Sequence, residues 1–197
     1  MRKSRLTFLI TSTAAAAAVG GWALSTGGSA SNAPPAAPAT IEPAAAGIHA
    51  RFAFLARQKS NVCGLQPSAI MGMSGPRRLQ GSCCFPMSLG AYRSQVAGLR
   101  SYAKLSVIPA DPYDVPVSLA KLLVAYDRTI QLTPTQARTY AHAMRMSSLK
   151  GPCCCHCWRW TAFRGLSRYL ISRRHWSTRP VARLTELLEG CGGPMGS

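Results

Sequence analysis

The chain has 197 residues, with 23 Lys and Arg against 6 Asp and Glu, and a formal net charge of +17 at pH 7. This length leaves room for one ordinary domain once targeting segments are set aside. The few acidic residues are dispersed, and neither a Gly-rich phosphate loop nor a G-x-S-x-G motif occurs in the sequence. The sequence therefore gives no support to hydrolytic chemistry, and we expect a binding or structural protein rather than an enzyme.

A large positive charge often indicates nucleic acid or another anionic partner. Here the basic residues are scattered along the chain, apart from the pairs Arg77-Arg78 and Arg173-Arg174. Such scattering is typical of a solvated basic surface. We expect no specific nucleic-acid partner.

Residues 1–30 have the order of a secretion signal. Basic residues come first, an uncharged apolar run over residues 6–24 follows, and small residues lead up to Ala30. The apolar run is also long enough to remain as an uncleaved membrane anchor. In either case we expect the rest of the chain to be extracytoplasmic, which means periplasmic, cell-surface or secreted, with membrane contact only through this segment.

The next segment, residues 31–60, begins with a stretch rich in Ala and Pro that buries little apolar surface. This composition predicts a flexible linker. Gly, Pro and Ser then recur at short intervals from Asn61 to Pro86, and we interpret that stretch as a Cys-rich loop region held by cross-links or metal. The sequence thus predicts a Cys-rich helical domain over residues 61–193.

The remaining pattern is helical, and no stretch alternates convincingly with period two. We therefore predict an all-α fold, a small bundle of about four to five helices. Ser88 is a candidate N-cap, and Thr133-Pro134-Thr135-Gln136 has the form of a capping box with proline at the first helical position. Further helices are predicted from about Trp158 to Ser172 and from Pro180 to Gly190. The apolar spacing predicts that the second and third helices bury Leu119, Leu122, Leu123 and Tyr126, and Ala137, Tyr140, Ala141 and Met144.

Eight cysteines are present, an even number that in an oxidising compartment favours disulfides. Yet four of them fall within five residues, Cys153 to Cys157. Bridges between adjacent cysteines are strained, so each member would need its own partner elsewhere. The full set is Cys63, Cys83, Cys84, Cys153, Cys154, Cys155, Cys157 and Cys191.

The Cys153–Cys157 stretch also has the chemistry of a soft-metal site, because thiolates select Cu(I), Zn(II) and similar ions. Cys154 and Cys157 have C-x-x-C spacing, and they precede a predicted helix whose dipole would lower the thiol pKa values. We therefore expect copper or zinc binding, with Cys191 as a further sulfur that could complete the coordination. The predicted ligands are Cys153, Cys154, Cys155, Cys157, Cys83, Cys84 and His156, with His142 and Met146 as a second pair on one helix face.

Two alternatives stay open beside metal binding. One is a disulfide-stapled, non-catalytic envelope protein, whose partner would be another envelope protein. The other is a thiol–disulfide oxidoreductase that uses the C-x-x-C pair, although no strand followed by C-x-x-C and a helix, as in thioredoxin, is visible. The segment Trp158-Arg159-Trp160 is interpreted as closing the core beside a metal or disulfide knot, or as stacking on a ligand.

Several motifs occur over the range from Cys63 to Gly193: Cys83-Cys84-Phe85-Pro86-Met87, Asp111-Pro112-Tyr113-Asp114 with Ser118-Leu119-Ala120-Lys121, the string from Gly151 to Trp160 that contains Cys153-Cys154-Cys155-His156-Cys157, and Cys191-Gly192-Gly193. In these motifs the chain resembles a group of exported prokaryotic Cys-rich proteins to which no activity is attached. The resemblance covers roughly Cys63 to Gly193. The resemblance implies one coherent domain over that range.

Overall fold

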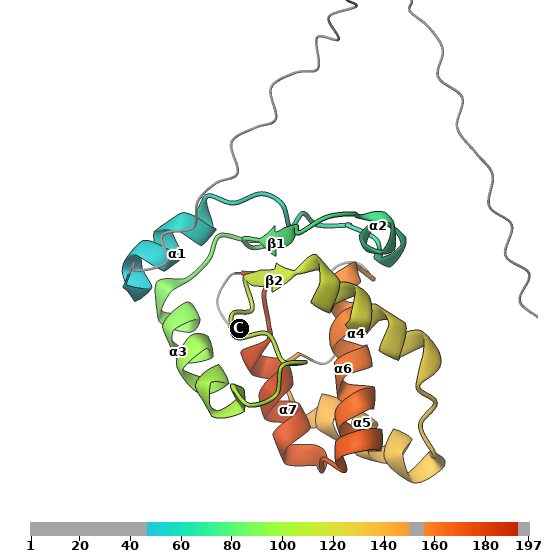
Figure 1. The fold of residues 1–197 in the computed structure, drawn as a ribbon. Coiled ribbons are helices and arrows are strands. Elements are labelled where there is room, and N and C mark those ends of the chain that lie inside the picture. The colour runs from blue at the N-terminus through green and yellow to red at the C-terminus, as the bar shows by residue number, and fades with distance from the viewer. Residues whose placement is uncertain (1–46, 150–155, 193–197) are drawn as a thin grey trace, which may run out of the picture. The chain divides into compact units, whose positions relative to one another are not determined.

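The computed structural model describes residues 47–149 and 156–192 (Figure 1). This part of the chain is mostly helical, as predicted, and it contains seven α-helices rather than four or five. The predicted signal or anchor over residues 1–30 lies outside the described residues. The elements are α1 (Ile48–Ala56), α2 (Pro67–Gly72), β1 (Arg78–Gln80), α3 (Leu89–Leu99), the 3₁₀ helix η1 (Arg100–Tyr102), β2 (Asp114–Pro116), α4 (Val117–Thr129), α5 (Pro134–Met146), α6 (Trp158–Arg174) and α7 (Thr178–Leu187).

The start signals in the sequence are confirmed. The Ser88 hydroxyl caps α3 by accepting a hydrogen bond from the Ala91 N–H at 3.5 Å. At α5 the Thr133 hydroxyl accepts from the Gln136 N–H at 3.3 Å, while the Gln136 side chain accepts from the Thr133 N–H at 3.1 Å. This reciprocal capping box satisfies two amide groups that the helix itself leaves unpaired.

Helix α1 was not predicted and lies inside the segment assigned to the flexible linker. Its Leu55 is fully buried and packs in a cluster with Phe54, Tyr92 and Tyr113. Burial of large apolar side chains offsets the entropy of ordering this short helix. Residues 48–56 therefore belong to the folded domain, which begins earlier than residue 61.

Two short strands were also missed. β1 and β2 pair antiparallel, with Leu79 opposite Val115 and both side chains buried. Each strand has only three residues, which is too short for a period-two pattern to stand out from the surrounding Gly- and Pro-rich sequence. The pairing places the Cys-rich loop region against the connector that leads into α4.

The central packing is between α4 and α6, the most extensive helix pair in the described chain. Gly165 in α6 permits this close approach, since a Cβ at that position would lie 2.7 Å from the Asp127 amide nitrogen and closer still to the Leu123 carbonyl oxygen. Leu123, Leu166 and Leu170 are buried around this crossing. None of the described helices is long and apolar enough to cross a membrane.

The buried faces of two helices differ from the prediction. In α4, Leu122 is 40% exposed, and the buried side chains are Val117, Ala120, Leu123 and Val124. In α5, Ala143 is buried whereas Ala137 and Ala141 are exposed. In α5 the alanines carry too little apolar surface to determine which face of the helix is buried. The contacts of α5 with α7 and α6 determine that face instead.

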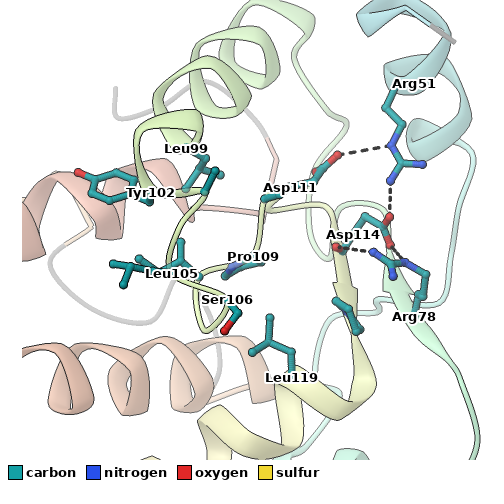
Figure 2. Close-up of a pocket in the computed structure, with 14 residues that line it drawn as sticks. Arg51, Arg78, Leu99, Tyr102, Leu105, Ser106, Pro109, Asp111, Asp114 and Leu119 are labelled. Atoms are coloured by element: carbon teal, nitrogen blue, oxygen red, sulfur yellow. Dashed lines mark hydrogen bonds and ion pairs between the residues drawn. The ribbon is translucent and has the colours of Figure 1, made fainter. Parts of the chain in front are cut away.

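An ion-pair network joins α1 to the strand pair (Figure 2). The Asp114 carboxylate, only 1% exposed, accepts hydrogen bonds from Arg51 Nη2 and, at 2.5 Å, from Arg78 Nε. Arg51 Nε also lies 3.6 Å from Asp111 Oδ2. The Tyr113 N–H donates to Asp111 Oδ1 at 2.9 Å, which forms an Asx-type turn.

Candidate metal centre

The segment after β1 meets the segment after α7. The amides of Cys84 and Phe85 donate to the Cys191 carbonyl at 3.2 and 2.7 Å, and the Cys83 amide donates to the Gly190 carbonyl at 3.4 Å. Gly192 follows with φ +77°, a left-handed conformation that favours glycine, and a Cβ there would lie 2.8 Å from the Phe85 carbonyl carbon. These backbone contacts bring cysteines from opposite ends of the domain together.

The Sγ atoms of Cys83, Cys84 and Cys191 all lie within 4.8 Å of one another. We refer to these three side chains as the thiol cluster; all are partly buried. Cys83 Sγ and Cys84 Sγ are 3.4 Å apart, far beyond the ~2.05 Å of a disulfide bond. A tetrahedral Zn²⁺ with Zn–S bonds of about 2.3 Å requires sulfur separations of about 3.8 Å. The three sulfur atoms are close enough together that they could hold one metal ion.

The surroundings of Cys83 favour its thiolate. A hydrogen bond with the Cys191 thiol, the positive charge of Arg159 and a hydrogen bond with Cys84 together lower the pKa of Cys83 from 9.0 to about 6, outweighing the opposing effects of burial and Glu189. The thiolate is the form that ligates metals. At neutral pH the cluster thus supplies at least one ligand that does not have to lose a proton first.

A charged shell lies next to the cluster. Glu189 Oε1 accepts a hydrogen bond from the Cys191 N–H at 2.6 Å, and burial raises the pKa of this carboxyl. Gln95 Nε2 from α3 donates to the Glu189 carbonyl at 2.6 Å. Arg159 from α6 is 3% exposed and donates from Nη1 to the Pro112 carbonyl at 2.6 Å. The shell thus joins α3, α6 and the segment after α7 beside the sulfur atoms.

Sequence reasoning did not assign Glu189 or Arg159 to this site. Arg159 was considered only for its neighbouring tryptophans, and its guanidinium does lie 5.1 Å from the centroid of the Trp158 ring. Its place beside the thiol cluster depends on how α6 packs against the chain after α7, which no local pattern reveals. The only local signal was its position between two tryptophans at the start of α6.

The predicted ligands fall into several places. Cys153, Cys154 and Cys155 lie outside the described residues. Cys157 is buried at the N-cap position of α6, and His156 beside it is exposed. In residues 47–149 and 156–192, the thiol cluster is the one group of three or more Cys, His, Asp or Glu side chains close enough to share an ion. It combines the predicted Cys83 and Cys84 with Cys191, which the sequence offered only as a completing sulfur.

The second predicted pair lies on α5. His142 and Met146 are both exposed, Met146 at 53%, and Met144 beside them is half-buried. His142 belongs to no group of three potential ligands among the described side chains. His142 with Met146 stays a prediction.

Trp158 closes the core as expected. It is 1% exposed, its indole Nε1–H donates to Asn61 Oδ1 at 2.9 Å, and its amide donates to the Leu65 carbonyl at 2.8 Å. These bonds tie the Cys-rich loop region to the start of α6. The loop region is thus held partly by side-chain hydrogen bonds, a means of support that the sequence did not predict.

A separate hollow of about 430 Å³ lies beside η1 and the start of α4 (Figure 2). Its walls are largely apolar, including Leu99, Leu105 and Leu119. The charged groups at its edge, among them Arg51 and Asp114, are already paired with one another. Its polar groups therefore serve the fold, and the thiol cluster remains the better candidate for chemistry.

Comparisons with protein-family models, with curated proteins and with solved structures found no match to this chain. The resemblance to exported prokaryotic Cys-rich proteins stays a prediction. What the protein does is therefore inferred from its own side chains.

Proposed function

We propose that this protein binds a soft metal ion, Cu(I) or Zn(II), for storage, transfer or sensing. One observation carries the proposal: three cysteine sulfurs from two distant segments lie within 4.8 Å of one another. Sulfur ligands select these ions over Mg²⁺ and Ca²⁺, which prefer oxygen. The thiolate character of Cys83 supports the same assignment.

Three sulfurs can complete a trigonal Cu(I) site, whereas structural Zn(II) sites take four ligands. We propose that the fourth ligand comes from the stretch that holds Cys153, Cys154, Cys155, His156 and Cys157. Its C-x-x-C spacing suits convergence on one ion, and its last member, Cys157, occupies the N-cap position of the helix that carries Arg159. His142 and Met146 are proposed as a weaker, separate pair on α5.

The proposed setting is extracytoplasmic. The charge, apolar run and small residues over residues 1–30 support a signal or an anchor, and the Ala/Pro-rich composition that follows supports a tether. On this proposal the Cys-rich helical domain is displayed outside the cytoplasm. Metal ions, and a further envelope protein that gives or takes them, are its proposed partners.

The test is a competition titration of the full chain, kept reduced, against a chromophoric chelator with Cu(I) or Zn(II). We expect one tightly bound ion in the wild type and loss of that ion in C83S/C84S/C191S. The variant C63S is the matched control, because Cys63 is an exposed cysteine outside the cluster, and it should bind as the wild type does. C154S/C157S should weaken Zn(II) more than Cu(I).

Two results would count against a metal site at the thiol cluster. A folded C83S/C84S/C191S variant that binds with unchanged affinity would remove the thiol cluster from the site. The second result is that, in protein purified in air, none of the eight cysteines reacts as a free thiol and reduction unfolds the chain. This result would instead favour a disulfide-stapled envelope protein.

Thiol–disulfide exchange is a second candidate, favoured by the lowered pKa of Cys83 and the adjacent thiols. The Cys83 thiolate would attack a substrate disulfide, release one thiolate and form a mixed disulfide. Cys191 would then displace the second substrate thiolate and leave a Cys83–Cys191 disulfide, which an added dithiol reduces. Turnover of a protein disulfide substrate that is lost in C83S would support this function, and absence of turnover in the wild type would exclude it.

A further inference from the structure

Arg159 is a buried charge with incomplete hydrogen bonding. Only 3% of the residue is exposed, and one guanidinium nitrogen, Nη1, donates to the Pro112 carbonyl. Nε and Nη2 are buried without a hydrogen-bond partner. Leaving donors of a charged group unpaired costs more than leaving neutral donors unpaired, so a ligand is expected to fill the gap.

Four of the buried side-chain atoms without a hydrogen-bond partner belong to residues beside the thiol cluster. Ser82 Oγ precedes Cys83, and Gln95 Oε1 belongs to the side chain that bonds the Glu189 carbonyl; both are buried and unpartnered, like Arg159 Nε and Nη2. All of them lie next to the thiol cluster or its charged shell. The paired arginines of α6, such as Arg164 with Asp127, show no such deficit.

Gly190 brings the guanidinium close to the cysteines. A Cβ at position 190 would lie 2.5 Å from Arg159 Cζ, so the guanidinium lies directly against this glycine. The neighbours of Gly190 are Glu189 and Cys191, and its carbonyl accepts the hydrogen bond from the Cys83 amide. The guanidinium of Arg159 therefore contacts the residue that immediately precedes Cys191 of the thiol cluster.

We infer that Arg159 is the outer-shell donor and counter-ion of the metal–thiolate complex. Three thiolates outnumber the positive charge of Cu(I) or Zn(II), so the complex is an anion in a partly buried site, where unbalanced charge is costly. The free N–H groups of Arg159 donate to the bound thiolate sulfurs and offset that charge. Groups in this position orient ligands and set affinity without touching the metal.

This inference rests on the proposed metal binding, and the experiment separates the two. The same competition titration is run on full-chain R159K, R159M and G190A, with folding checked by circular dichroism. R159M should weaken Cu(I) or Zn(II) binding about 10- to 100-fold, and R159K should recover part of the loss because it retains the charge. G190A should weaken binding too, because its methyl group displaces the guanidinium.

Two variants control for general damage. R164M removes another partly buried arginine of α6, and G72A adds a methyl group that meets nothing within 4 Å. Both should bind metal as the wild type does. Wild-type affinity in R159M and G190A would overturn the role of Arg159 and leave metal binding intact, whereas a wild type that binds no metal would overturn the proposed function itself. R159K as weak as R159M would show that retained charge does not suffice, and would overturn the counter-ion role.

Discussion

Cys83 lies among groups that hold its sulfur in the thiolate form. Alkylation by iodoacetamide follows the thiolate fraction, so the rate at Cys83 in the metal-free protein should rise with a midpoint at pH about 6 and level off about one to two pH units higher. In the urea-unfolded chain the same rate should keep rising towards pH 9. Mass spectrometry of the peptide that contains Cys83 measures both profiles.

Cys191 makes the largest contribution to that lowered pKa. C191S should therefore move the midpoint of the Cys83 profile upward, while C63S should leave it in place. A profile of folded wild type that matches the unfolded chain would show that the cluster does not form as described.

At the scale of residues, the sequence pointed to sulfur chemistry but did not identify all the residues of the candidate site. Cys83 and Cys84 were among the predicted ligands, because vicinal thiols are conspicuous in any sequence. Cys191 joins them through backbone bonds from the distant end of the domain, and Arg159 joins through helix packing. Long-range pairings of this kind leave no trace in local spacing.

At the scale of elements, the α4–α6 crossing depends on Gly165. G165A should destabilise the domain by about 1–3 kcal/mol, because the added methyl group collides with backbone atoms of α4, which cannot move aside as a side chain can. G90A in α3 is the control, since its nearest atom would be 4.0 Å away, and alanine should be neutral or stabilise the helix by up to about 1 kcal/mol. Urea unfolding measures both; equal stability of the two variants would contradict this packing.

The attachment of α1 depends on Asp114. D114N should lower the free energy of unfolding by about 2–3 kcal/mol. Breaking a fully buried ion pair costs ~3–5 kcal/mol, and the loss is smaller here because the Arg78 side chain is 42% exposed. E186Q, which weakens the exposed Arg183–Glu186 pair, should cost under about 1 kcal/mol. Hydrogen exchange should accelerate in α1 of D114N and not of E186Q; unchanged exchange in D114N would show that apolar packing alone holds this helix.

Elements with local start signals were predictable, and those without were not. Thr133 and Ser88 announce α5 and α3 within a few residues, because a capping side chain bonds amides that are adjacent in sequence. Helix α1 has no side-chain cap and follows an Ala/Pro-rich stretch, so its stability comes from partners far along the chain. The strand pair depends in the same way on a partner more than thirty residues away.

At the scale of the whole molecule, most of the few acidic residues are at least partly buried in the fold. Asp111, Asp114 and Asp127 lie in partly buried ion pairs with arginines, and Glu189 is partly buried beside the thiol cluster. The charge of +17 therefore resides mainly in basic groups that the fold does not neutralise.

The central claim is that sulfur atoms of the thiol cluster ligate a soft metal, and X-ray absorption spectroscopy of the loaded full chain tests it most directly. We predict a first shell dominated by sulfur, at about 2.3 Å when the ion is Zn(II), and its loss in C83S/C84S/C191S. A first shell of nitrogen and oxygen alone, or an unchanged sulfur shell in that variant, would contradict the claim.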